Sequence, residues 1–212
     1  MPTETPPASE DKPRDFPMLA TSVGATAASL QSAYLGERSE AAQTKARSQL
    51  AELRRSAGFT PDQHPLALQT VLELLTPPLS DMELGRGEHA SRSETAAFSA
   101  LTLFAWHMQS ATTPAHVPGQ SFGSAMGTLR ARTDSESLKP RFDALLASRH
   151  AASRLTHART LISLLRNEKI GLDYGKFAGD LSTLSGSKRA GVLLRWSRDF
   201  STSFRKGPSK PA

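Results

Sequence analysis

The segment from residue 144 to residue 167, ALLASRHAASRLTHARTLISLLRN, contains four arginines and two histidines but no acidic residue. On a helix with about 100° per residue, one arc contains Ala151, Leu155, Ala158, Leu161, Ile162 and Leu165, which is typical of a core-facing stripe. A neighbouring arc carries only guanidinium and hydroxyl groups, namely Arg149, Thr156, Arg159, Thr160, Ser163 and Arg166. Such groups hydrogen-bond phosphate oxygens, so this face predicts an anionic partner. The alternative to an anionic partner is a solvated face, or arginines paired with acids from another helix.

Two further segments are basic. Residues 186–206 contain six basic residues and one acidic residue, and residues 38–58 contain five basic and two acidic residues. The whole chain has 26 Lys and Arg against 20 Asp and Glu, with a pI near 10.0. Three basic helices predict a surface track for a sugar–phosphate backbone. Aromatic residues make up only 6% of the chain, too few for an extended base-stacking platform, so sequence-specific readout is not expected.

Residues with catalytic potential are scattered. His89, Glu94 and His107 lack the spacing of a helical metal site, and Asp173, Asp180 and Asp199 are isolated, with Asp199 expected to pair with Arg195 or Arg198. There is no cysteine and no glycine-rich phosphate loop. The sequence therefore predicts a binding protein with no catalytic residue, no metal and no cofactor. A helical adaptor whose basic faces bind acidic partner proteins remains the main alternative.

The elements that must position these side chains all read as helices, so the predicted fold class is all-α, with two packed helical halves. Expected helices cover residues 38–57, 60–77, 91–109, 121–132, 140–167 (with a possible bend), 172–184 and 187–204. The predicted organisation is a disordered proline-rich tail over 1–20, an N-terminal subdomain over 21–115, a C-terminal bundle over 116–206 and a tail over 207–212. Thr112–Gln120 is the expected linker.

The helix over 91–109 is apolar nearly all round, so we expect it to be the most buried. Phe104 and Trp106 should be largely buried in the N-terminal half and Trp196 in the C-terminal half. The longest nearly apolar run, residues 96–106, is too short to cross a bilayer, which requires about 20 residues. Without an apolar signal core at its start, the chain is expected to be cytoplasmic, with no membrane partner.

Five blocks in order, SFGSAM at 121–126, SLKPRFDALLASRH at 137–150, LTHARTLISLL at 155–165, IGLDYGKFAGDL at 170–181 and RWSRDF at 195–200, make the chain resemble CasB, the small subunit of the type I-E CRISPR interference complex called Cascade. The resemblance covers residues 38–204. It implies a non-enzymatic protein that binds nucleic acid without sequence preference and helps hold opened target DNA as an R-loop.

The resemblance also implies partners and site residues. The expected partners are crRNA, the target and non-target DNA backbone, the backbone and large subunits of Cascade, and a second copy of the chain. The nucleic-acid-binding residues that carry over are Arg54, Arg55, Arg141, Arg149, Arg159, Lys188 and Arg189. We expect Arg149, Arg159 and Arg189 to lie on polar surface that is not needed for folding.

Overall fold

The computed structural model describes residues 18–206, and the two expected tails lie largely outside this range. The described residues form α1 (Leu19–Tyr34), α2 (Glu40–Arg55), a 3-10 turn η1 (Pro61–Gln63), α3 (Pro65–Leu74), α4 (Arg92–His107), α5 (Phe122–Thr133), α6 (Leu138–Ala147), α7 (Ala151–Asn167), α8 (Tyr174–Leu184) and α9 (Arg189–Lys206). The only strand-like pairing within them is one isolated bridge between His116 and Leu172. The expected all-α fold is confirmed.

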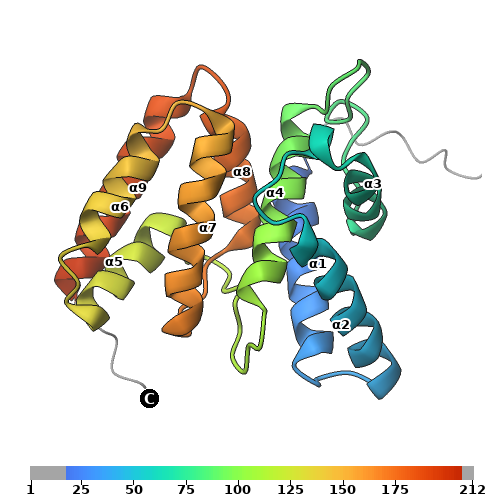
Figure 1. Ribbon diagram of the computed structural model, residues 1–212, viewed down its shortest axis with the longest axis horizontal. Coiled ribbons are helices and arrows are strands. Elements are labelled where there is room, and N and C mark those ends of the chain that lie inside the picture. Colours follow the sequence, from blue (N-terminus) through green and yellow to red (C-terminus); the bar gives the residue numbers. More distant parts are fainter. Residues whose placement is uncertain (1–17, 207–212) are drawn as a thin grey trace, which may run out of the picture.

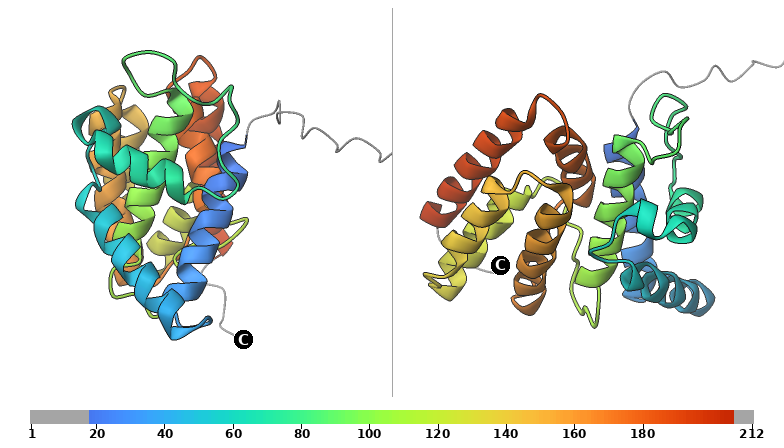
Figure 2. Two further views of the ribbon diagram at one scale, coloured as in Figure 1. Left: turned by 90° about the vertical axis from the view of Figure 1, so that its right-hand side faces the viewer. Right: turned by 45° about the horizontal axis from the view of Figure 1, so that its top comes forward.

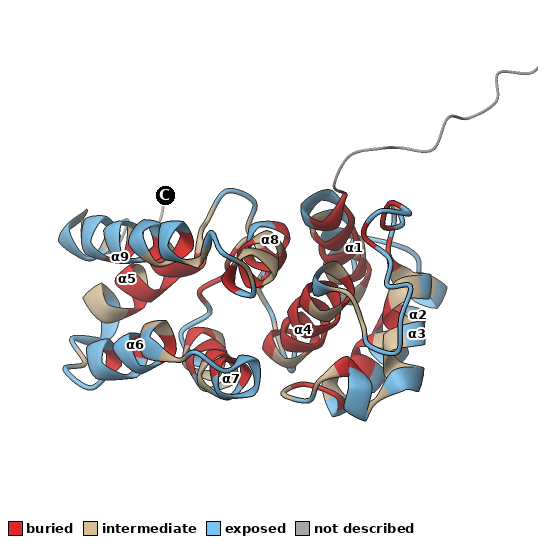
Figure 3. Cartoon of the chain, turned by 90° about the horizontal axis from the view of Figure 1, so that it is seen from above, coloured by how far each residue is buried: buried red, intermediate tan, exposed pale blue. Residues whose placement is uncertain are grey.

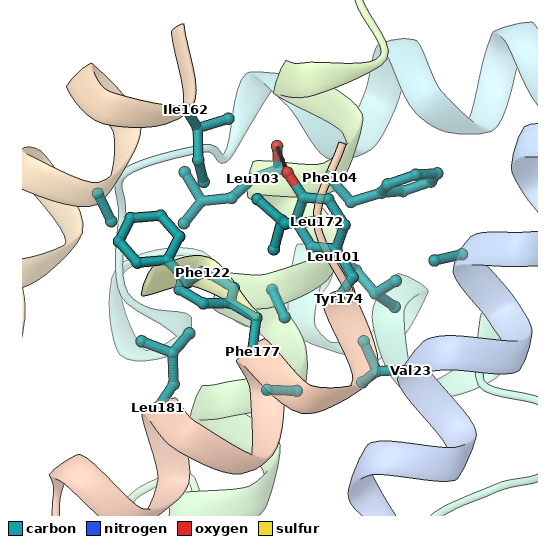
Figure 4. Packing of buried hydrophobic residues seen from close by; sticks show 14 of the residues in the cluster. Val23, Leu101, Leu103, Phe104, Phe122, Ile162, Leu172, Tyr174, Phe177 and Leu181 are labelled. Atoms are coloured by element: carbon teal, nitrogen blue, oxygen red, sulfur yellow. Dashed lines mark hydrogen bonds between the residues drawn. The ribbon is translucent and has the colours of Figure 1, made fainter. Parts of the chain in front are cut away.

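Helices from the two ends of the chain share one hydrophobic core. Helices α5, α6, α7 and α9 form one side of the molecule, and α1, α2 and α3 form the other (Figures 1 and 2). Between them, α8 packs against both α1 and α4, and α4 also packs against α7. The close view in Figure 4 shows Val23, Phe104, Phe122, Ile162 and Phe177, from five different helices, in one cluster. The hydrophobic core is therefore continuous across the expected linker.

Helix α4 is the central helix, as its composition predicts. Twelve of its 16 residues are buried, and it is coloured as buried almost all round in Figure 3. Its start is fixed by a capping box: Ser91 Oγ accepts a hydrogen bond from Glu94 N at 3.0 Å, while Ser91 N donates to Glu94 Oε2 at 2.6 Å. Phe104 is fully buried.

The two tryptophans differ in burial. Trp196 is 1% exposed and donates its Nε1–H to Asp180 Oδ2 at 2.6 Å. Trp106 is only partly buried, because it lies at the seam between α4 and α7. Trp106, expected to be largely buried, therefore packs at the edge of the core and not inside it.

Helix α1 was not predicted as a separate element. Its sequence, LATSVGATAASLQSAY, is rich in small residues, so its apolar stripe is weak. Tertiary contacts stabilise it instead. Glu83, 64 residues away from Leu19, accepts hydrogen bonds from Met18 N at 2.8 Å and Leu19 N at 3.0 Å and so caps the helix. Close packing brings Gly24 against Gly175 of α8.

Two of the expected helices are interrupted. The segment over 60–77 divides into η1 and α3, because Pro65 starts a new helix whose first turn needs no proline N–H. The segment over 140–167 divides into α6 and α7 at residues 148–150. The bend there is a complete break, and it exposes the carbonyl end of α6 to side chains from α7 and α9.

Helices α5 and α9 approach each other at backbone contact. A Cβ on Gly123 would lie 2.3 Å from the carbonyl oxygen of Trp196, and a Cβ on Gly127 would lie 2.3 Å from that of Phe200. No Cβ can occupy such a position, so both residues must be glycine if the helices are to pack this closely. This contact joins the SFGSAM block of α5 to the RWSRDF block of α9.

Candidate nucleic-acid interface

The end of α6 is where the structure gathers three of the seven expected basic residues, Arg149, Lys188 and Arg189. Arg189, the first residue of α9, donates from Nη2 to Leu146 O at 2.9 Å and to Ser148 O at 2.8 Å. Arg154 of α7 donates from Nη1 to Ser148 O at 3.4 Å and to Arg149 O at 3.2 Å. The two guanidinium groups therefore satisfy carbonyls that α6 leaves free at its C-terminus, where the helix dipole favours cations.

Arg189 thus differs from the expectation of a surface residue without a structural role. Its side chain is partly buried, and its Nε is fully buried without a hydrogen-bond partner. The Nη2 of Arg189 therefore caps α6, although the sequence predicts that Arg189 binds phosphate.

Arg149 and Lys188 are exposed beside this cap, one on the turn between α6 and α7 and the other directly before α9. Neither side chain has an acidic partner within 4 Å among the described residues. Arg92, at the start of α4, is exposed and lies near Gly186, and a narrow cleft connects it to Arg154. Three helices, α4, α7 and α9, and the residues just before α7 and α9 therefore bring cationic side chains to one end of the molecule.

Arg154 is a cationic residue at the end of α6 that the sequence did not single out. It is only 6% exposed, and burial, followed by the nearby positive charge of Arg189, lowers its pKa from the ordinary arginine value. A lowered pKa means that holding two cations here costs the fold free energy. The role of Arg154 depends on the break between α6 and α7, which helical periodicity alone does not locate.

A second group of expected residues lies at the seam of α4 and α7. The guanidinium carbon of Arg159 lies 4.1 Å from the centre of the Trp106 ring, and that of Arg166 lies 5.3 Å from it. The loop after α2 approaches the same place, since a Cβ on Gly58 would be 3.4 Å from Arg159 Nη1. Arg54 and Arg55 occupy the last turn of α2, shortly before this loop.

Arg141 stands apart. It is exposed on α6, and no hydrogen bond or ion pair within residues 18–206 connects it to the other candidates. The candidates therefore divide into Arg149, Lys188 and Arg189 around the end of α6 and Arg159 at the α4–α7 seam. Arg54 and Arg55 lie in the last turn of α2, before the loop that reaches Arg159, and Arg141 lies outside both places.

The cationic surface is little neutralised by the protein itself. Three ion pairs within 4 Å are present in the described part of the chain: His89 with Asp62, Lys139 with Asp143, and Arg195 with Asp180. None of them involves a candidate residue. The alternative in which these arginines pair with acids of another helix therefore does not apply.

The carboxylates have structural partners. Asp180 accepts from Trp196 and from Arg195, and burial raises its pKa although both partners favour the charged form. Asp199 accepts from Ser121 Oγ at 2.6 Å and pairs with neither Arg195 nor Arg198 within 4 Å, so its expected ion pair is wrong. Asp173 caps α8 through Lys176 N at 3.0 Å. Within residues 18–206, no three His, Asp or Glu side chains come together as metal ligands would.

None of the helices in the described range combines the length and apolar character needed to span a bilayer.

Comparisons with known proteins agree with this architecture. Residues 49–200 match the family model of the CRISPR-associated protein Cse2. No curated protein sequence was found that matches the chain. Among solved structures, CasB from Thermobifida fusca superposes with a TM-score of 0.68 at 25% identity, covering 86% of this chain and 97% of that chain.

Two other solved structures share the fold at lower identity. A Cse2-family protein from Thermus thermophilus has a TM-score of 0.60 at 22% identity, covering 86% of this chain and 97% of its own. A chain of a CRISPR RNA-guided surveillance complex has a TM-score of 0.61 at 15% identity, covering 89% and 96%. Because the family model spans most of its length, and the resemblance to CasB in its motifs is confirmed, the chain belongs to the CRISPR-associated Cse2 family.

Proposed function

We propose that the protein is the non-catalytic small subunit of a type I-E CRISPR RNA-guided surveillance complex, in which it binds nucleic-acid backbone without sequence preference and restrains the displaced strand of the R-loop. The observation that carries this proposal is the set of basic side chains on α2, α6, α7 and α9 that have no acidic partner among the described residues. A chain with the same fold is part of a CRISPR RNA-guided surveillance complex.

Small free energies decide whether an R-loop is stable. Exchanging a DNA duplex for an RNA–DNA heteroduplex is nearly balanced, so a few contacts to the displaced strand can tip the exchange. Guanidinium and ammonium groups supply such contacts to any sequence, because every nucleotide presents the same phosphate. The proposed partners are crRNA and DNA backbone, the other subunits of the complex, and a second copy of the chain.

The protein alone provides the first test. It should bind single-stranded DNA weakly and without sequence preference. With about four to six phosphates contacted, the logarithm of the binding constant should fall with log salt at a slope of roughly −3 to −4. Salt-independent binding, or a strong preference for one sequence, would contradict the proposal.

The assembled complex provides the second test, which separates this function from that of a protein adaptor. Charge reversal at Arg141, Arg149 and Lys188 uses exposed side chains, and so avoids the structural role of Arg189. The triple variant should join the complex but lower its affinity for matched DNA by at least tenfold, because repulsion of phosphate adds to the lost contacts. Arg86→Glu, in an exposed loop outside the helices, is the matched control.

Native mass spectrometry reports composition, and a mobility-shift titration reports DNA affinity. An adaptor would give the opposite pattern, in which the triple variant is missing from complexes that still bind target DNA normally.

A further inference from the structure

The indole of Trp106 is held in a fixed orientation between two helices. Its Nε1–H donates to Ser163 Oγ of α7 at 2.8 Å, and that hydroxyl donates in turn to Arg159 O at 2.9 Å. Trp106 itself lies in the last turn of α4 and is partly exposed. The ring therefore forms a rigid plate at the surface of the α4–α7 seam.

Two guanidinium groups lie over this plate, within the range of cation–π contacts. Arg166 is fixed further, because its Nη1 donates to Gln109 Oε1 at 3.0 Å and to Trp106 O at 3.4 Å. The guanidinium of Arg159 donates no hydrogen bond to any described residue, and Gly58 confines it on another side. Stacking orders a guanidinium through its flat face and leaves its in-plane N–H groups free to donate.

No anion of the protein serves these donors. Neither arginine has a carboxylate within 4 Å in the described part of the chain, and residues 144–167 contain no Asp or Glu. The positive field at the seam is also felt inside the fold, since Arg166 contributes, after burial, to the lowered pKa of His107. Two ordered cations over one aromatic ring match an anion with several acceptor oxygens.

We propose that Trp106 is a positioning residue, which holds Arg159 and Arg166 as a clamp for one phosphodiester group of a nucleic-acid strand. This inference rests on the proposed function and adds two residues to its site, Trp106 and Arg166. Phosphate suits the clamp because a diester offers its oxygens to two guanidinium forks at once. Trp106 supplies affinity without touching the strand, because it reduces the freedom that both arginines lose on binding.

The test uses the intact protein and fluorescein-labelled oligo(dT), with Trp106→Leu, Trp106→Phe, Arg159→Ala and Arg166→Ala variants. Trp106→Leu should weaken binding about five- to tenfold, and Trp106→Phe, which keeps an aromatic face, should restore most of the loss. Each arginine variant should reduce the steepness of the salt slope by roughly 0.7. In the Arg159→Ala/Arg166→Ala background, Trp106→Leu should have no further effect. Arg86→Ala is the control for a surface arginine outside the clamp.

Intrinsic fluorescence gives an independent readout, because the chain has two tryptophans and Trp196 is fully buried. Unlabelled oligo(dT) should change the emission of the native protein and leave that of Trp106→Phe unchanged. This measurement decides the matter even if Trp106→Leu does not fold.

Each failure has its own signature. If the native protein binds DNA with the expected salt slope, but Trp106→Leu and Arg166→Ala bind equally well, the clamp is wrong and the proposed function stands. If the native protein binds no nucleic acid, alone or in the complex, both are wrong. If the Trp106 and Arg166 variants keep DNA affinity but fail to join the complex, the seam binds an acidic protein surface and the clamp is again wrong.

Discussion

Neighbouring residues of the same charge have different roles in this protein. Lys188 and Arg189 are adjacent in the sequence, and the sequence assigns both to phosphate binding. In the structure Lys188 is exposed, whereas Arg189 donates two hydrogen bonds to carbonyls at the end of α6. The sequence predicts a basic surface because charge and helical periodicity are local properties. Which arginine caps a helix depends on the break between α6 and α7, and that break is set by tertiary structure.

We therefore expect Arg189→Ala to lower the free energy of unfolding by about 1–3 kcal/mol, because it leaves the carbonyl of Leu146 without its partner in a partly buried site. Lys188→Ala should change stability by less than about 0.5 kcal/mol. Urea unfolding of both variants measures the difference. Equal stability of the two variants would show that the hydrogen bonds of Arg189 contribute nothing to the fold.

Among the elements, the helices with strong end signals were predicted best. The capping residues at Ser91 and Ser121 start α4 and α5 where the sequence places them, and α8 begins within two residues of its expected start. Helix α1 was missed because its residues are small and its cap, Glu83, comes from a distant loop. Local patterns locate an element that carries its own signals, but not one that depends on partners elsewhere in the chain.

The contact between α5 and α9 gives the prediction at this scale. Gly123→Ala should destabilise the protein by about 1–3 kcal/mol or more, because its Cβ would overlap the backbone of Trp196 and force the helices apart. Gly191→Ala is the matched control: it also lies in a helix, α9, but a Cβ there meets nothing within 4 Å. This control should stabilise the protein by up to about 1 kcal/mol, because alanine favours the helix more than glycine does.

Thermal and urea unfolding of the two glycine variants would test the argument. If Gly123→Ala proved as harmless as Gly191→Ala, the helices would not be in backbone contact in solution.

At the scale of the whole molecule, a network of polar contacts joins helices from the two expected halves. Tyr174 of α8 packs edge-on against Phe104 of α4, and its hydroxyl lies 2.9 Å from His107 Nδ1. Its backbone N–H donates to His116 Nδ1 at 3.1 Å, and Gln31 of α1 holds the backbone of His116 on both sides. Composition could not predict this network, because its residues, from Gln31 to Tyr174, are separated by up to 143 residues of sequence.

The two histidines of this network make the free energy of unfolding depend on pH. Burial, followed by the charge of Arg166, lowers the pKa of His107 to about 4, and burial also lowers the pKa of His116. The histidine stays neutral in the folded protein, whereas in the unfolded chain it gains a proton as the pH falls below its ordinary pKa of 6.5. Proton binding to the unfolded state alone lowers the free energy of unfolding. The stability due to His107 should be fully present above pH 6.5 and fall by about 3 kcal/mol by pH 4.

Urea unfolding between pH 7 and pH 5 measures this effect, because the pKa of Glu83 lies below its ordinary value of 4.5 and its carboxylate therefore titrates mainly below this window. At pH 5, the native protein should have lost about 2 kcal/mol through His107. His107→Gln keeps a side chain that can hydrogen-bond Tyr174 and removes the ionisable ring, so its stability should fall less over the same range. If the native protein and the variant lose stability in parallel, His107 is not the group that couples the joining of the two halves to pH.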